Sequence, residues 1–218
     1  MSVDISSRFN IGDSIPALGV SLGGMTTGSV PYNNVTFDLK RVNTMRAVIV
    51  GTQGKGDGGQ LKPISGIPVG VAPTSLVFLH ASAKPASNRE SFRLIWDQQD
   101  TADLLGWYEA IYEDGFVATI PIRYGVNIRE WNWDKRVSAD DYCYNADALA
   151  VGGEEKNRIT FFAFEWVNPR LGKMVQEIRL KGTTNFRGAS GEFNDDYGPV
   201  IASNAVILAA LSVVKKRS

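Results

Sequence analysis

Short apolar runs with alternating hydrophobic and polar positions recur along the chain, and turn-forming residues separate them. In residues 116–124 every second side chain is apolar, from Phe116 through Ile120 to Tyr124. This period of two residues is typical of a β-strand with one buried face. The pattern predicts strands at 35–39, 47–50, 76–80, 107–112, 116–124, 159–167, 175–180 and 205–214.

Two of these runs carry further local signals. Glu113-Asp114-Gly115 separates 107–112 from 116–124, and Asp-Gly supplies the positive φ of a tight turn, so we predict a hairpin there. Residues 206–211 are apolar throughout, which predicts a central strand covered on both faces. A short helix is the alternative for this run, but the β-branched residues that follow it favour the strand.

Helical signals are weak, since only residues 97–105 have a composition suited to a helix. Many short strands without amphipathic helices between them predict an all-β fold, a jelly-roll β-sandwich. A length of 218 residues suits one domain of this class, and neither a repeat nor a linker divides the chain. We therefore predict a single domain over residues 1–218, with 51–59 as a surface loop.

Composition and charge narrow the function. Lys and Arg together number 23, as do Asp and Glu, and this balance argues against a nucleic-acid partner. With Cys143 and His80 as the only residues of their types, an internal disulfide, a cysteine-based metal site and a multi-histidine zinc site are excluded. The first ten residues lack a signal-peptide pattern, and 205–214 is too short to span a bilayer. The chain is thus expected to be cytoplasmic or an excised piece of an exported protein, without a membrane role.

Catalysis of glycoside hydrolysis would require two carboxyl groups that flank the scissile bond. No pattern in the sequence singles out two acidic residues as such a pair, so the sequence favours a non-catalytic protein. Loop carboxylates could also hold calcium, but the regular spacing of a calcium loop is absent. The candidate acids are Asp140, Asp141, Glu154, Glu155, Glu165, Asp195 and Asp196.

Trp131 and Trp133 are the most informative aromatic residues, because they lie between a strand and a polar loop. An exposed indole can stack on the apolar face of a sugar while neighbours such as Arg129 and Asp134 bond its hydroxyl groups. Alternatively, an indole closes the end of the sandwich. For Trp131 we favour the second role, in which the indole closes the end of the sandwich. For Trp133 neither role is favoured over the other. The other tryptophans are predicted to lie in the core: Trp96, Trp107 and Trp166.

His80 ends the apolar run 76–79 and shares a strand face with Leu76 and Phe78. This position favours a histidine of the core or sheet edge with one hydrogen-bond partner. In a functional role, His80 would lie at the rim of a binding face.

Several segments in order resemble an accessory module of bacterial polysaccharide-degrading enzymes, one of the galactose-binding-like jelly rolls. The resemblance spans roughly residues 66–211. It implies a jelly roll, a supporting or sugar-binding role and, in some members, a structural calcium. The segments that carry it are 66–70, 75–81, 120–128 with Trp131 behind it, 164–169 and 178–180.

The leading hypothesis is therefore a non-catalytic carbohydrate-associated module. Arg129, Trp131 and Trp133 are the expected glycan contacts, with His80 and Asp134 as secondary candidates. A glycoside hydrolase or lyase is the second hypothesis and needs a carboxylate pair in one cleft. A structural domain that binds protein through exposed edges or apolar patches is the third.

Overall fold

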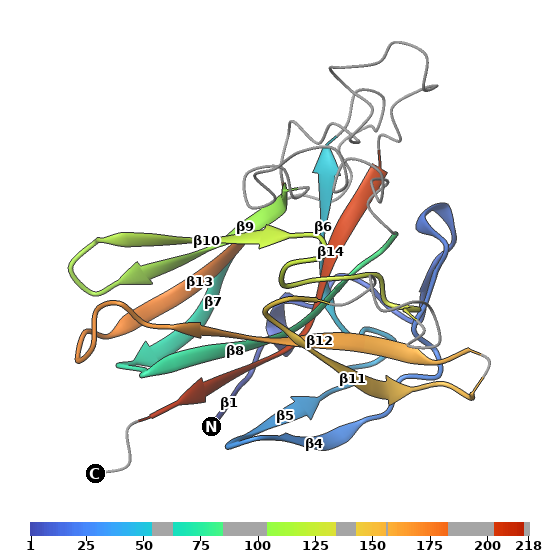
Figure 1. Ribbon diagram of the computed structural model, residues 1–218, viewed down its shortest axis with the longest axis horizontal. Helices are drawn as coiled ribbons and strands as arrows, with labels where there is room; N and C mark the ends of the chain where they lie inside the picture. The colour runs from blue at the N-terminus through green and yellow to red at the C-terminus, as the bar shows by residue number, and fades with distance from the viewer. Residues whose placement is uncertain (54–62, 85–103, 134–142, 156, 183–202, 216–218) are drawn as a thin grey trace.

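The computed structural model describes residues 1–53, 63–84, 104–133, 143–155, 157–182 and 203–215, and β-strands dominate it (Figure 1). The named strands pair antiparallel, which confirms the all-β prediction. The elements are β1 (Ser2–Val3), η1 (Ser6–Arg8), β2 (Ser14–Ile15), η2 (Pro16–Leu18), β3 (Val20–Ser21), β4 (Gly28–Tyr32), β5 (Val35–Leu39), β6 (Val48–Gln53), β7 (Ile64–Val71), β8 (Ser75–Ser82), β9 (Leu104–Tyr112), β10 (Val117–Arg123), β11 (Asp147–Gly152), β12 (Ile159–Val167), β13 (Val175–Gly182) and β14 (Ser203–Val214).

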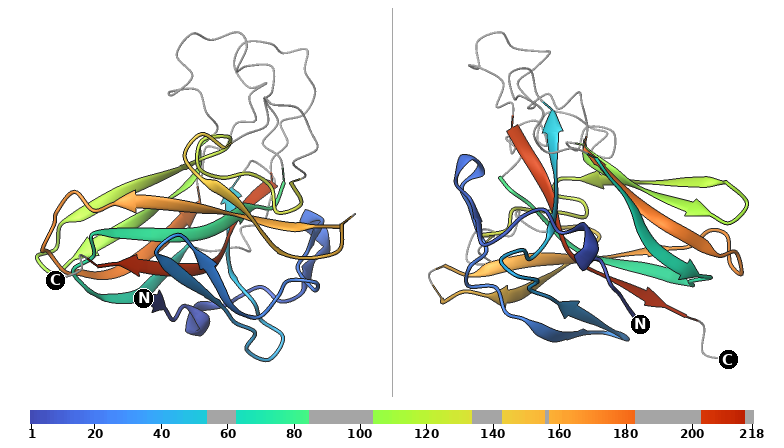
Figure 2. Two further views of the ribbon diagram at one scale, coloured as in Figure 1. Left: turned by 60° about the horizontal axis from the view of Figure 1, so that its bottom comes forward. Right: turned by 180° about the vertical axis from the view of Figure 1, so that it is seen from behind.

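The strands form a layered sandwich around one large sheet. That six-stranded sheet has the order β1-β14-β8-β12-β11, with β6 also paired to β14. A four-stranded sheet, β10-β9-β13-β7, lies over one of its faces. The β4–β5 hairpin and the N-terminal segment lie over the other face (Figures 1 and 2).

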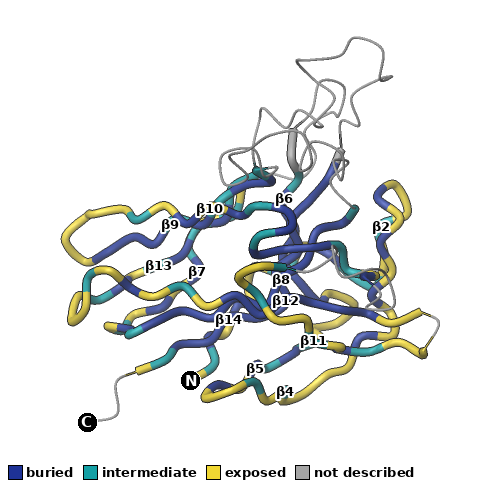
Figure 3. The backbone as a smooth tube through the Cα atoms, in the orientation of Figure 1, coloured by how far each residue is buried: buried dark blue, intermediate teal, exposed yellow. Residues whose placement is uncertain are grey.

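Two hydrophobic cores share the six-stranded sheet because successive side chains of a strand point to opposite faces. In β14, Val206 and Leu208 belong to the core between the two large sheets. Ile207 and Ala209 belong to the core beneath the hairpin. The central strands are therefore buried along most of their length, as the dark blue tube in Figure 3 shows. The prediction of a strand covered on both faces at 206–211 is confirmed.

The β9–β10 hairpin also forms as predicted. Gly115 adopts a φ of 81°, and its N–H donates to the Tyr112 carbonyl across the turn. The inward set predicted for 116–124 is correct for Ile120 and Tyr124 but wrong for Phe116, which is 51% exposed. The turn ends one residue later than the alternation suggests, so Phe116 lies outside the strand.

The hydrophobic pattern of the sequence did not predict every strand. β7 contains Gly66, Pro68 and Gly70, and both glycines have positive φ, so turn-forming residues interrupt its alternation. The run 97–105 begins outside the described residues, and its last two positions start β9 instead of ending a helix. The predicted loop at 51–59 also falls mostly outside them. No helix in the described part of the chain has the length and apolar character needed to cross a membrane.

Candidate functional site

Residues 129–133, which contain both candidate tryptophans, run between the diverging ends of β8 and β12. These strands pair directly only as far as His80 and Phe162. Beyond that point, Ser82 N–H donates to the Arg129 carbonyl at 2.8 Å, and Trp131 N–H donates to the Ser82 carbonyl at 2.9 Å. On the other side, Thr160 N–H donates to the Trp131 carbonyl at 2.7 Å. The segment is therefore held by backbone bonds on both sides.

The β11–β12 turn lies against the N-terminal segment and is fastened to it in the same way. Gly153 N–H donates to the Gly24 carbonyl at 3.0 Å. The buried guanidinium of Arg46 in turn donates to the carbonyls of Gly23 and Met25 and pairs with Asp13. Because the backbone groups of both segments are bonded, neither needs a ligand to hold its position.

These three segments enclose a pocket of about 550 Å³. It combines indole surface with hydroxyl, amide, carboxylate and guanidinium groups, a mixture suited to a polar ligand that has apolar faces. Its lining residues are Ser21, Gly24, Trp131, Asn132, Trp133, Gly153, Glu154, Glu155, Asn157, Arg158 and Ile159.

The two tryptophans differ in accessibility. Trp131 is half-buried: it packs against the core beneath the hairpin and also borders the pocket. Trp133 is only 7% exposed and meets Phe162 edge to face, with 5.8 Å between ring centroids. Trp131 consequently offers the pocket more indole surface than Trp133.

His80 lies in the interior, away from the rim of any face. Its Nε2 is 2.7 Å from the Asn127 carbonyl oxygen and its Nδ1 is 2.9 Å from the Tyr108 hydroxyl. A carbonyl only accepts, so Nε2 carries the proton and Nδ1 accepts from Tyr108. Burial lowers the pKa of His80, and the hydrogen bond to the Asn127 carbonyl raises it. Burial has the larger effect, so the pKa falls to about 4. The expected core position is correct, with two partners in place of one.

Arg129 is also buried, with its guanidinium 5.4 Å from the centroid of the Tyr124 ring. The Tyr124 hydroxyl donates to the Glu130 carboxylate. Neither Arg129 nor His80 borders the described pocket, and Asp134 lies outside the described residues.

Burial raises the pKa of Cys143 to about 12, which keeps this thiol protonated and weakly nucleophilic at neutral pH.

Of the candidate acids, Glu154 and Glu155 border the pocket, on the same turn. Glu165 is exposed on β12 and accepts a hydrogen bond from Ser75. Within the described residues, no group of three or more His, Cys, Asp or Glu side chains could hold a metal ion. The other four acids lie outside those residues: Asp140, Asp141, Asp195 and Asp196.

Sequence reasoning missed several lining residues, among them Ser21, Gly24, Asn157 and Arg158. The glycine pair at 152–153 before two glutamates indicates a turn. Nothing in the sequence indicates that this turn meets residues 21–24, because the two segments are more than a hundred positions apart.

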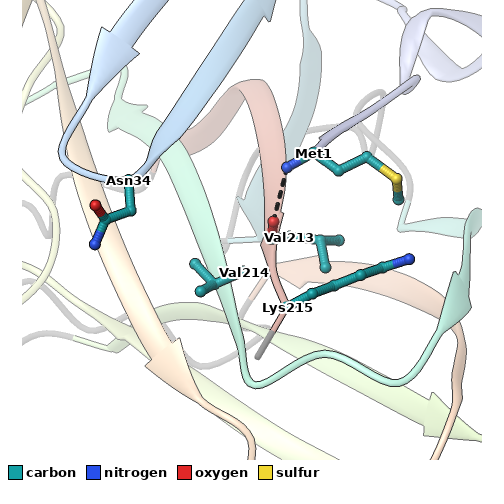
Figure 4. A pocket seen from close by; sticks show the side chains of 5 residues that line it. All are labelled: Met1, Asn34, Val213, Val214 and Lys215. Carbon is teal, nitrogen blue, oxygen red and sulfur yellow. Dashed lines mark hydrogen bonds between the residues drawn. The ribbon is translucent and has the colours of Figure 1, made fainter. Parts of the chain in front are cut away.

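A second pocket, of about 410 Å³, lies at the end of β14 (Figure 4). The Met1 amino group donates to the Val213 carbonyl at 2.9 Å along its wall. Asn34 and Lys215 supply polar side chains, but none of its lining residues is aromatic. It offers fewer directed contacts than the tryptophan pocket.

Comparison of the chain with models of protein families, with curated proteins and with solved structures finds no significant match.

Proposed function

We propose that this chain is a non-catalytic carbohydrate-binding module, a jelly-roll sandwich of the galactose-binding-like type, whose ligand occupies the tryptophan pocket. The observation that carries the proposal is a half-buried indole, Trp131, in a pocket ringed by polar side chains. Sugars present apolar C–H faces and a rim of hydroxyl groups, and both need partners at once.

The polar partners come from the tryptophan segment itself and from the β11–β12 turn. Asn132 and Asn157 are exposed amides that can both donate and accept, and Arg158 is a donor. The backbone bonds of Ser82, Thr160 and Gly24 hold these segments without a ligand, so little ordering cost accompanies binding. A site of this kind fits affinities of about millimolar to micromolar.

A glycoside hydrolase is the second candidate, since Glu154 and Glu155 border the same pocket. Hydrolysis needs one carboxyl group on each side of the scissile bond. Two consecutive residues of one turn approach a ligand from the same wall, which favours binding over cleavage. A structural domain that binds protein is the third candidate, and a broad apolar patch buried in a symmetric dimer would favour it.

The test is affinity electrophoresis of the wild type in gels that contain plant, algal or bacterial polysaccharides. Trp131→Ala should weaken retention by about tenfold or more, because truncating a tryptophan hot spot of a binding site costs about 2 kcal/mol or more, and about 1.4 kcal/mol is already tenfold. Asn157→Ala should weaken it less. Phe116→Ala is the matched control, since this exposed aromatic residue lies outside the pocket.

Circular dichroism of each variant checks the fold. Retention of wild type by none of the polysaccharides would refute the proposal. Release of reducing ends by wild type, lost in Glu154→Gln or Glu155→Gln, would favour the hydrolase instead.

A further inference from the structure

The six-stranded sheet ends at β11, and part of this strand has an open backbone on one side. β11 pairs with β12, and no strand follows it in the sheet order (Figure 1). Towards its end, Thr26 N–H donates to the Val151 carbonyl at 2.7 Å. Over Asp147–Ala150, by contrast, no described residue bonds the backbone on the side away from β12. This stretch therefore presents N–H and C=O groups that a further strand can pair with.

Two other edge strands carry side chains that block such pairing. On β10, the Asn127 side chain accepts from Arg123 N–H and donates to the Pro121 carbonyl. Pro121 also lacks an N–H of its own. On β6, the Asn10 side chain bonds both the N–H and the carbonyl of Ile49. β11 has no proline, lysine or arginine over residues 147–150, so the usual devices that protect an edge are absent from this stretch.

The side chains of β11 fit a second copy of the same strand. Leu149 packs towards the core beneath the hairpin, so Ala148 and Ala150 point to the opposite face, where both are exposed. An antiparallel copy centred on Leu149 places Ala148 opposite Ala150 of the other chain, and these small side chains let the backbones approach. The Asp147 carboxylates then lie at opposite ends of the pairing, so like charges do not meet.

The overall charge also favours a second copy as the occupant. Lys and Arg number 23, as do Asp and Glu, so two copies do not repel each other through net charge. We infer that β11 pairs antiparallel with β11 of a second copy about a twofold axis, which joins the two six-stranded sheets into one. This inference goes beyond the proposed function and does not depend on it.

The test is sedimentation velocity at protein concentrations from about 1 μM to about 1 mM, a range that covers weak and moderate dimers. Wild type should change from monomer to dimer within this range. Ala148→Lys combined with Ala150→Lys should weaken dimerisation about tenfold, because it places ammonium groups opposite each other in two cross-strand pairs. Ala148→Lys combined with Ala150→Glu should restore dimerisation, since each ammonium group then lies opposite a carboxylate.

Val117→Lys combined with Thr119→Lys is the matched control. It adds the same charge at two exposed positions of β10, whose edge Asn127 already blocks, and should leave dimerisation nearly unchanged. Hydrogen exchange of wild type provides a second measurement that needs no variant. The amides of residues 147–150 that point away from β12 should exchange more slowly at concentrations where the dimer forms.

The outcomes decide between β11 and any other surface. A wild type that stays monomeric at about 1 mM would overturn the inference, even if the edge accepts a strand of another protein. A dimer that the double lysine variant leaves intact, without added protection of residues 147–150, would also overturn it. Dimerisation weakened in the folded double lysine variant and restored in the lysine–glutamate variant would support the pairing of β11 with a second copy.

Discussion

At the scale of single residues, the polar groups of this protein's interior are bonded in pairs or networks. His80 bonds Tyr108 and Asn127 and connects β8 to β9 and to the segment that follows β10. The Asn127 side chain extends the network, since it accepts from Arg123 N–H and donates to the Pro121 carbonyl. His80 thus orders the chain that leads to the tryptophan pocket, although it does not border the pocket.

His80 should make the protein less stable in acid. Burial lowers its folded-state pKa from 6.5 to about 4, so below pH 6.5 the unfolded chain takes up a proton that the folded protein does not. Stability present above pH 6.5 is therefore lost as the pH falls towards 4, by about 3 kcal/mol. Urea denaturation at pH 7 and pH 4 measures the loss, and His80→Gln should reduce the difference between the two values. An equal difference in wild type and variant would contradict the assignment.

At the scale of elements, the β11–β12 turn depends on glycine for its contacts. Gly153 has a φ of 78°, and a Cβ built on it would lie 2.0 Å from the Asn157 carbonyl oxygen. Gly152 forms a β-bridge with Met25, and a Cβ built on Gly152 would lie 2.2 Å from the Gly24 carbonyl oxygen. The turn that carries Glu154 and Asn157 is therefore packed backbone to backbone.

Gly153→Ala should disturb this turn more than a comparable substitution elsewhere. Gly172 provides the matched control: its φ is 81°, and a Cβ there would meet nothing within 4 Å. Gly172→Ala should cost about 1–2 kcal/mol of backbone strain. Gly153→Ala should cost about 1–3 kcal/mol more from the clash and should also weaken polysaccharide retention. Thermal unfolding and affinity gels measure both effects, and equal costs for the two variants would show that the contact with Asn157 relaxes freely.

At the scale of the whole molecule, one sheet supports two cores. Its strands β8, β12 and β14 place alternate side chains in each core, so loss of either core would expose one apolar face of the shared sheet. Phe78 of β8 stacks on Tyr108 of the four-stranded sheet, with 4.0 Å between ring centroids. Val77, the preceding residue, faces the hairpin side. This sharing couples the described layers mechanically.

Unfolding should therefore be one cooperative transition, whichever core is weakened. Leu208→Ala and Ile207→Ala truncate adjacent, fully buried residues in different cores, and each should cost about 2–5 kcal/mol. Tryptophan fluorescence and far-ultraviolet circular dichroism should give coincident urea transitions in both variants. Val117→Ala, at an exposed position of β10, is the control and should change stability by less than about 0.5 kcal/mol. Separate midpoints for the two probes would refute the coupling of the cores.

Local patterns predicted the strands that carry regular alternation or continuous apolar runs, and the Asp114-Gly115 turn. They did not predict β7, whose glycines and proline are typical of turns yet here stay within a sheet pairing. Trp107 shows a related limit. Its strand was predicted, but which face of that strand turns inward depends on the sheet that packs against it, and Trp107 is half-buried on the outer face.

The amino-acid sequence by itself determined the all-β class and the central, doubly covered position of β14, because these depend on periodicity and hydrophobicity within a few residues. It also marked Trp131 and Trp133 as candidates and excluded cysteine and multi-histidine metal chemistry. Only the tertiary structure decided that these indoles meet Asn157 and Ser21 in one pocket, and that His80 and Arg129 are buried. The reason is physical: backbone bonds between segments distant in sequence build the pocket, and no local pattern encodes such pairings.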